Sequence, residues 1–129
     1  MKVAAARKQS PCEDEERARV LTRAVHGVAD HLGLTNRDIS AILGISESSV
    51  TRLRQGRVMP YPSKEAEFAA LLVRLYRSLD TLVGGDARKA SAWFRAPNAH
   101  LNGIPAERVR TIEGLVDVVQ YLDAMRGKL

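Results

Sequence analysis

The sequence predicts an all-α fold, and three observations support this prediction. Hydrophobic residues make up 45% of the 129 residues and aromatic residues only 5%, so aliphatic side chains must supply most of the core. Apolar residues recur at spacings of three and four along several segments, which is the period of a helix with one buried face. Glycine and proline gather in short clusters between those segments, and no segment has the pattern of a convincing β-strand.

The first helix is predicted to begin near Glu13, after a flexible arm formed by residues 1–12. Acidic side chains occupy every position from Glu13 to Glu16, which suits the positive end of a helix dipole. Gly33 is expected to end this helix. The side chains expected to form its apolar stripe are Val20, Leu21, Ala24, Val28 and Leu32.

Two short helices are predicted next, joined by a turn at Gly44. Thr35 or Asn36 is expected to cap the first of them. Ser46 is expected to cap the second, and Gly56 to close it. The apolar residues that would pack the two helices together are Ile39, Ile42, Leu43, Ile45, Val50 and Leu53. Two short helices packed steeply around a turn glycine form a helix-turn-helix motif.

Residues 58–63 contain two prolines and are predicted to be a linker. The longest helix is predicted to follow over residues 64–83, with Gly84 and Gly85 as its stop. Its leading apolar residues are Phe68, Leu71, Leu72, Leu75, Leu79 and Leu82. Further apolar residues widen this surface, and they are Ala66, Ala69, Ala70 and Val73. Part of the helix is therefore expected to face a second subunit.

The remaining residues predict three helical segments. Asp86 is expected to cap a helix that runs through Ala96. Pro105 suits the first position of a short helical segment, and Thr111 is expected to open the final helix. The apolar face of that final helix comprises Leu115, Val118, Val119, Leu122 and Met125.

The second helix of the helix-turn-helix is a candidate DNA-binding element. The formal net charge of +5 permits an anionic partner, with nucleic acid the first candidate. Short hydrogen-bonding side chains on the outward face are followed by cations, which suits contact with base edges and then with phosphates. The predicted DNA-binding residues are Arg37, Ser46, Glu47, Ser48, Ser49, Thr51, Arg52, Gln55 and Arg57. Glu47 fits less well because its carboxylate repels phosphate, although it can accept from cytosine. The alternative is a helical hairpin that never touches DNA.

Two stretches of the sequence resemble one protein family. Residues 14–57 resemble the Xre-type helix-turn-helix of bacterial and phage repressors, with Ser40 where that family usually has alanine. The later stretch resembles the C-terminal toxin-binding domain of Xre/MbcA/ParS antitoxins. The residues that carry this second resemblance are Ala90, Trp93, Phe94, Pro97, Asn98, Gly103, Pro105, Thr111 and Gly114.

The residues of this second pattern also have physical roles of their own. Trp93 and Phe94 are expected to fill a small core. Asn98 is expected to hold the turn that follows, and Gly103 to adopt a conformation that other residues resist. Gly114 within a helix indicates that another backbone packs close to it.

The resemblance implies an antitoxin of a type II toxin–antitoxin system that neutralises a partner toxin and represses its own operon. It implies a toxin of the RES class, which degrades NAD, and an antitoxin C-terminus that approaches the toxin's active-site cleft. The expected toxin-binding residues are Asn98, Arg110, Tyr121, Met125, Arg126, Lys128 and Leu129. The expected domains are a helix-turn-helix domain (13–62), a connecting or dimerisation helix (63–85) and a toxin-binding domain (86–129). A homodimer, and a higher-order complex with the toxin, are expected.

No catalytic, metal-binding or cofactor-binding motif is evident, so neither an enzyme nor a cofactor is predicted. The three histidines and Cys12 do not have the spacing of a metal site. A single cysteine and the lack of a signal peptide or membrane-spanning run predict a cytoplasmic protein. Two alternatives stay open. The chain could be a stand-alone repressor whose C-terminal half only dimerises, or a structural adaptor without a DNA role.

Overall fold

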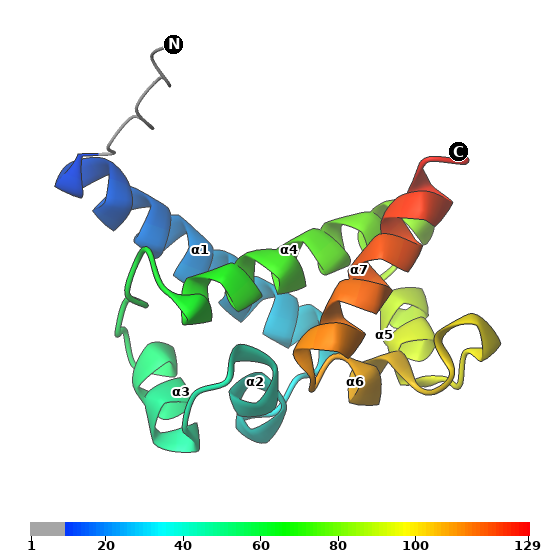
Figure 1. Ribbon diagram of the computed structural model, residues 1–129, viewed down its shortest axis with the longest axis horizontal. Coiled ribbons are helices and arrows are strands. Elements are labelled where there is room, and N and C mark those ends of the chain that lie inside the picture. Colours follow the sequence, from blue (N-terminus) through cyan, green and yellow to red (C-terminus); the bar gives the residue numbers. More distant parts are fainter. Residues whose placement is uncertain (1–9) are drawn as a thin grey trace, which may run out of the picture.

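The computed structural model describes residues 10–129, and the regular structure in that range is helical (Figure 1). The α-helices are α1 (Pro11–Leu32), α2 (Asn36–Leu43), α3 (Glu47–Arg54), α4 (Lys64–Leu82), α5 (Ala87–Arg95), α6 (Pro105–Arg108) and α7 (Ile112–Arg126), and a 3₁₀ helix, η1, spans Ala99–Leu101. The predicted all-α fold is therefore confirmed. The predicted arm lies mostly outside the described residues, and α1 begins at Pro11, two positions before the predicted start.

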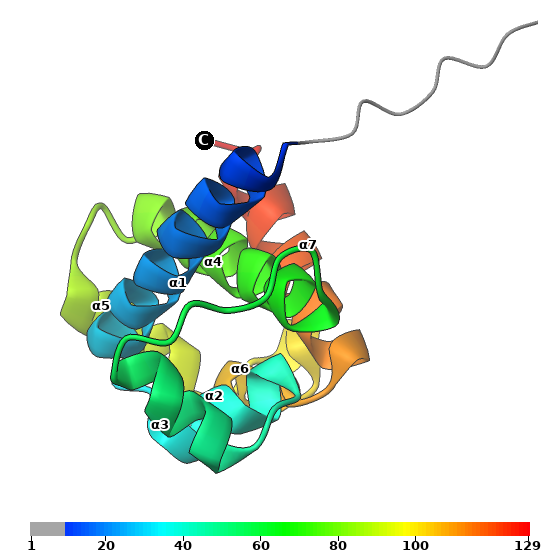
Figure 2. The same cartoon turned by 90° about the vertical axis from the view of Figure 1, so that its left-hand side faces the viewer.

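Helix α4 runs through the middle of the molecule and packs against α1, α2, α5 and α7. Figures 1 and 2 show α1, α4 and α7 in one layer, with α2, α3 and α6 on the side that lies below it in Figure 1. Small side chains let α4 approach its neighbours closely: Ala69 is fully buried, as are Leu72 and Leu75. Ala66 and Val73 are also buried within the chain, whereas Ala70 is exposed. Packing within one subunit thus covers most of this apolar surface, and a contact of α4 with a second subunit stays a prediction.

The helix-turn-helix forms around the predicted turn glycine. Gly44 ends α2 in the left-handed conformation, with φ 68°, which a residue without Cβ adopts at little cost. Ser40 donates a hydrogen bond of 2.5 Å from its hydroxyl to the carbonyl oxygen of Ile45. The serine that departs from the family pattern therefore ties α2 to the turn. The predicted apolar contacts are confirmed, because Ile39, Ile42, Leu43, Val50 and Leu53 are all buried.

Predicted capping residues are confirmed at the starts of four helices. Thr35 and Asp38 form a reciprocal capping box at α2, so the cap is Thr35 rather than Asn36. The side chains of Ser46, Asp86 and Thr111 accept hydrogen bonds from backbone N–H groups at the starts of α3, α5 and α7. These bonds satisfy donors that a helix cannot satisfy internally.

The buried face of α1 matches the predicted stripe at two of its five positions, and Leu21 and Ala24 of that stripe are only half-buried. Val20 is 52% exposed, whereas Val25 and Ala29 are each 1% exposed. Val28 and Leu32 belong to both the predicted and the observed buried face. In the N-terminal half of α1, the face that is buried lies beside the predicted one. A valine on this half of α1 therefore faces solvent.

The predicted linker is anchored to the core. Met59 is 1% exposed, and its backbone N–H donates to the hydroxyl of Thr22 on α1 at 3.1 Å. The methionine side chain fills space beside α1, which fixes the path from α3 to α4.

Gly114 lies where the first turn of α7 meets the end of α6. A Cβ atom built at this position would overlap the carbonyl oxygen of Arg108 and lie 2.6 Å from its carbonyl carbon. The expectation that another backbone packs close to Gly114 is confirmed. Because a carbonyl group cannot rotate away as a side chain can, the α6–α7 junction requires glycine here.

We expect Gly114→Ala to lower the free energy of unfolding by about 2 kcal/mol or more, because the added methyl group must displace backbone. The matched control is Gly27→Ala in α1, where a new Cβ meets no atom within 4 Å. That change should raise stability by about 0.5–1 kcal/mol, since alanine favours the helix. Urea unfolding of both variants measures the difference, and equal effects of the same sign would contradict this account.

Candidate functional site

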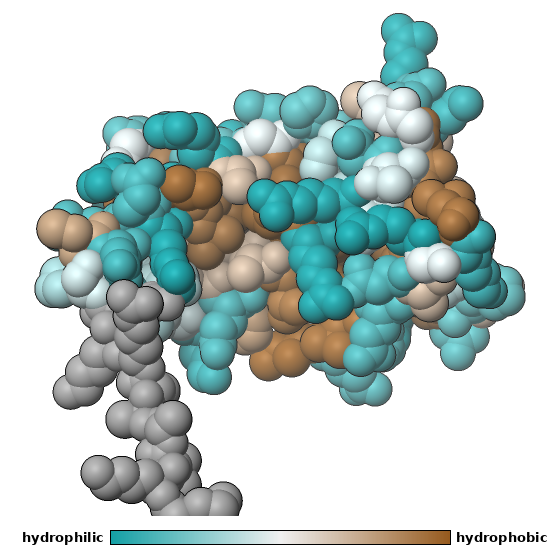
Figure 3. Space-filling model, turned by 90° about the horizontal axis from the view of Figure 1, so that it is seen from above, coloured by the Kyte–Doolittle hydropathy of each residue, from teal (hydrophilic) through white to brown (hydrophobic). Residues whose placement is uncertain are grey.

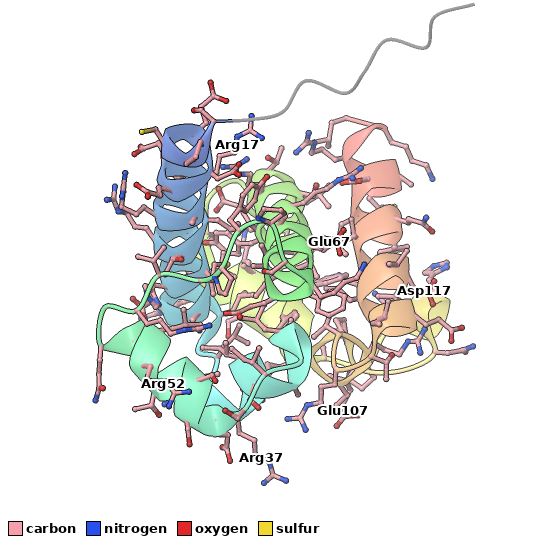
Figure 4. All side chains as sticks on the ribbon, turned by 60° about the vertical axis from the view of Figure 1, so that its left-hand side comes forward. Arg17, Arg37, Arg52, Glu67, Glu107 and Asp117 are labelled. Atoms are coloured by element: carbon pink, nitrogen blue, oxygen red, sulfur yellow. The ribbon has the colours of Figure 1, made fainter. Side chains whose placement is uncertain are left out.

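Helix α3 presents a polar face on one side of the helix-turn-helix. Val50 and Leu53 bury the opposite face in the core. The exposed residues from the predicted DNA-binding set are Arg37, Ser46, Glu47, Ser48, Thr51, Arg52 and Gln55, and Ser49 is half-buried. Figure 4 shows Arg37 and Arg52 at the same end of the molecule. The structure therefore brings most of the predicted set onto one surface.

Hydrogen bonds orient the side chains at the start of α3. The hydroxyl of Ser46 donates to that of Ser49 at 3.0 Å, and Arg52 donates to the same Ser49 oxygen at 3.1 Å. Arg52 forms no ion pair with a carboxylate among the described residues. Its guanidinium keeps donors available for an external acceptor.

Two cations at the end of the helix-turn-helix are bound within the protein. Arg54 pairs with Asp30 of α1 at 3.3 Å. Arg57 donates to both carboxylate oxygens of Glu65, at 3.1 and 3.2 Å. This paired geometry links the segment after α3 to the start of α4. Arg57, named above as a DNA contact, has a structural role, and its contact with DNA stays a prediction.

Asp38 joins the helix-turn-helix to the C-terminal half of the chain. Its carboxylate accepts the Thr35 N–H at 3.0 Å and an N–H of Arg110 at 2.9 Å. Arg95, at the end of α5, lies 3.5 Å from the same carboxylate and donates to the carbonyl oxygen of Gly33 at 3.1 Å. The sequence marks Asp38 only as a first-turn acid, so neither arginine partner was predicted.

The environment of Asp38 lowers the pKa of its carboxyl group. Burial acts in the opposite direction and raises the pKa, but hydrogen bonds from Thr35 and Arg110 and the charge of Arg95 outweigh it. The net direction is below the ordinary value of 3.8. The charged form is thus favoured in the folded protein.

An aromatic stack covers part of the C-terminal half. The ring of Tyr121 lies between those of Trp93 and His100, with centroid distances of 6.3 and 5.8 Å. Trp93 is only half-buried, whereas Phe94 is fully buried. The prediction that both fill the core is therefore confirmed for Phe94, whereas Trp93 is partly buried and packs against the edge of the core, with its ring on that of Tyr121.

Asn98 holds the turn that was predicted from its residue type. Its side-chain oxygen accepts from the N–H groups of His100 and Leu101, at 3.0 and 3.3 Å. Its backbone exchanges two hydrogen bonds with Gly103, which has φ 155°. That φ confirms the conformational role predicted for Gly103.

The predicted toxin-binding residues do not form one cluster. Arg110 precedes α7 and is bound to Asp38, while Met125–Leu129 lie at and beyond the last turn of that helix. The 15 residues of α7 separate the two groups, a length of about 22 Å. Arg126, Lys128 and Leu129 are exposed and Met125 is half-buried. Contact of any of these residues with a toxin stays a prediction.

Residues 10–129 contain no cluster of three or more histidine, cysteine or acidic side chains that could hold a metal ion. In the same range, no helix has the length and apolar character needed to span a membrane.

Comparison with known protein families gives two matches. Residues 13–74 match the antitoxin Xre-like helix-turn-helix domain, and residues 78–128 match the antitoxin Xre/MbcA/ParS C-terminal toxin-binding domain. The matched ranges are separated by residues 75–77 of α4 and together cover most of the chain. A search of curated proteins found no match. Both matched domains are regulatory or protein-binding modules.

We expect Asp38→Asn to lower the free energy of unfolding at pH 7 by about 1–2 kcal/mol, because it removes the charge that holds Arg95 and Arg110. The pKa of Asp38 is lowered by folding, so its charge stabilises the protein above the ordinary pKa. That contribution should be lost as the pH falls below about 4.

Urea unfolding of wild type and variant from pH 7 to pH 2.5 measures this loss. The difference in free energy of unfolding between wild type and Asp38→Asn should be constant near neutral pH and should shrink in acid. The control is Glu15→Gln, which neutralises an exposed carboxylate that forms no ion pair with a described residue. A gap for Asp38→Asn that does not change with pH would contradict the assignment.

Proposed function

Because the chain belongs to the Xre/MbcA/ParS family of antitoxins, we propose that it neutralises a partner toxin and represses its own operon by binding the operator. The observation that supports this most directly is the presence of both matched domains in one chain. We further propose that the toxin is of the RES class and degrades NAD. The family resemblance supports that assignment.

DNA would be bound by the exposed face of α3. Recognition helices of this motif enter the major groove with their N-terminal residues against base edges. Here that position is occupied by Ser48 and Ser49, whose hydroxyls can donate and accept. Arg52, which is bonded to Ser49, and the exposed Arg37 on α2 would contact phosphates or guanine. Two half-sites on an operator require two such helices, so we propose a homodimer.

The toxin would be bound by the C-terminal half. Tyr121 offers a partly exposed aromatic ring, and Arg126 and Lys128 offer cations near the end of the chain. A cation beside a site that binds an anionic dinucleotide is chemically favourable. The antitoxin itself would carry out no reaction and need no cofactor. Both roles would be performed in the cytoplasm, where operator DNA is located.

We expect Arg52→Ala to weaken binding to the DNA upstream of its own gene by about tenfold, a loss of about 1–3 kcal/mol for a base-contacting arginine. Fluorescence anisotropy at several salt concentrations measures the affinity. Melting curves should stay unchanged because the side chain is exposed. Arg77→Ala, which removes the same charge from α4, is the matched control. Equal DNA affinity of wild type and Arg52→Ala would exclude the proposed interface.

We expect the gene beside this one to arrest growth and deplete NAD when expressed alone. Co-expression of this chain should restore both. Arg52→Ala should restore growth as well as wild type does, because neutralisation does not require DNA. A neighbour without toxicity would favour the alternative of a stand-alone repressor.

A further inference from the structure

A groove lies on the side of the molecule away from α3. It has a volume of about 820 Å³ and is bounded by the N-terminal half of α1, the middle of α4 and the end of α7. Figure 4 shows these three helices side by side, with α4 in the middle. Helices α1 and α7 each pack against α4, so they form two walls above a shared floor.

The lining of this groove is apolar and partly exposed, and its apolar side chains come from both α1 and α4. Val20 is 52% exposed, and it lies with Leu21, Ala24, Ala70 and Val73 along the groove. Figure 3 looks onto this side and shows hydrophobic side chains exposed between hydrophilic ones. The apolar side chain that the core leaves uncovered on α1 is thus part of a continuous surface, which is typical of an interaction site.

The rim of the groove is positively charged. Arg74 pairs with Asp123, which also accepts from Ser78 at 2.8 Å. Glu16 pairs with Arg19 at 3.1 Å. Both carboxylates of the groove, Glu16 and Asp123, therefore already have an arginine partner.

The other three rim arginines, Arg17, Arg77 and Arg126, form no ion pair with a described residue. An acidic partner would complement this charge.

The orientation of the groove argues against a second copy of the chain as its occupant. Figure 4 shows Arg17 at one end of the molecule and Arg37 and Arg52 at the other. A two-fold dimer through the groove would direct its two α3 helices away from each other. An operator-binding dimer must present both helices to the same duplex, so the homodimer proposed above needs another surface.

We propose that this groove binds an amphipathic helix of the partner toxin, with an apolar face against α4 and carboxylates against the arginine rim. The proposal rests on the proposed function and extends it, because one wall belongs to the helix-turn-helix domain rather than to the toxin-binding domain. A helix laid between α1 and α7 would pack on α4 with its apolar face toward the groove. Since the groove faces away from α3, DNA and toxin can be bound together.

The test measures the affinity of the purified full chain for the toxin encoded beside it, by titration calorimetry. Val20→Glu and Arg77→Glu should each weaken toxin binding by about tenfold or more, because each opposes an acidic, apolar helix. Val58→Glu is the matched control for the first change, since Val58 is 44% exposed outside the groove. Arg88→Glu on α5 is the control for the second. Both controls should bind toxin as wild type does.

Two further measurements separate the outcomes. Val20→Glu should bind DNA and melt as wild type does, because the groove lies away from α3. If Val20→Glu binds the toxin as tightly as Val58→Glu does, the groove is not the toxin site. The same holds if Val20→Glu changes the mass of the protein measured without toxin, by altering its self-association, and leaves toxin affinity unchanged. If wild type fails to bind the toxin at all, the proposed function fails first, and this proposal fails with it.

Discussion

The close packing of α4 against α1 on one side and α7 on the other holds the two halves of the chain together. Ala69 and Leu72 of α4 have no exposed surface. Larger residues at the alanine positions would separate the helices and open the core. The helix-turn-helix contacts α4 through α2, and the C-terminal segments contact α4 through α5 and α7. The position of each candidate surface therefore depends on α4.

Asp38 adds a polar connection to this apolar one. It caps α2 and at the same time binds Arg95 and Arg110 from the other half of the chain. A single carboxylate thus orients the first helix of the DNA-binding motif relative to the segment that precedes α7.

The two candidate interfaces occupy opposite sides of this unit. The exposed face of α3 carries hydroxyls and arginines suited to DNA. The groove between α1 and α7 combines an apolar lining with Arg17, Arg77 and Arg126, which form no ion pair with a described residue. This separation gives a physical basis for an antitoxin that binds toxin and operator without competition between them. The proposed toxin site also accounts for the exposure of Val20, which lines the groove and is not part of the buried core.

Local signals in the sequence determined the helices and their ends. A capping hydroxyl such as Ser46, or a left-handed glycine such as Gly44, acts within one turn of the chain, so its effect can be predicted without the fold. Tertiary structure decided which faces are covered and which charges meet. Arg110 binds a carboxylate 72 residues away, and no local pattern records such a pairing. Val20 follows the helical period but faces solvent, because burial depends on where α4 and α7 lie rather than on the period itself.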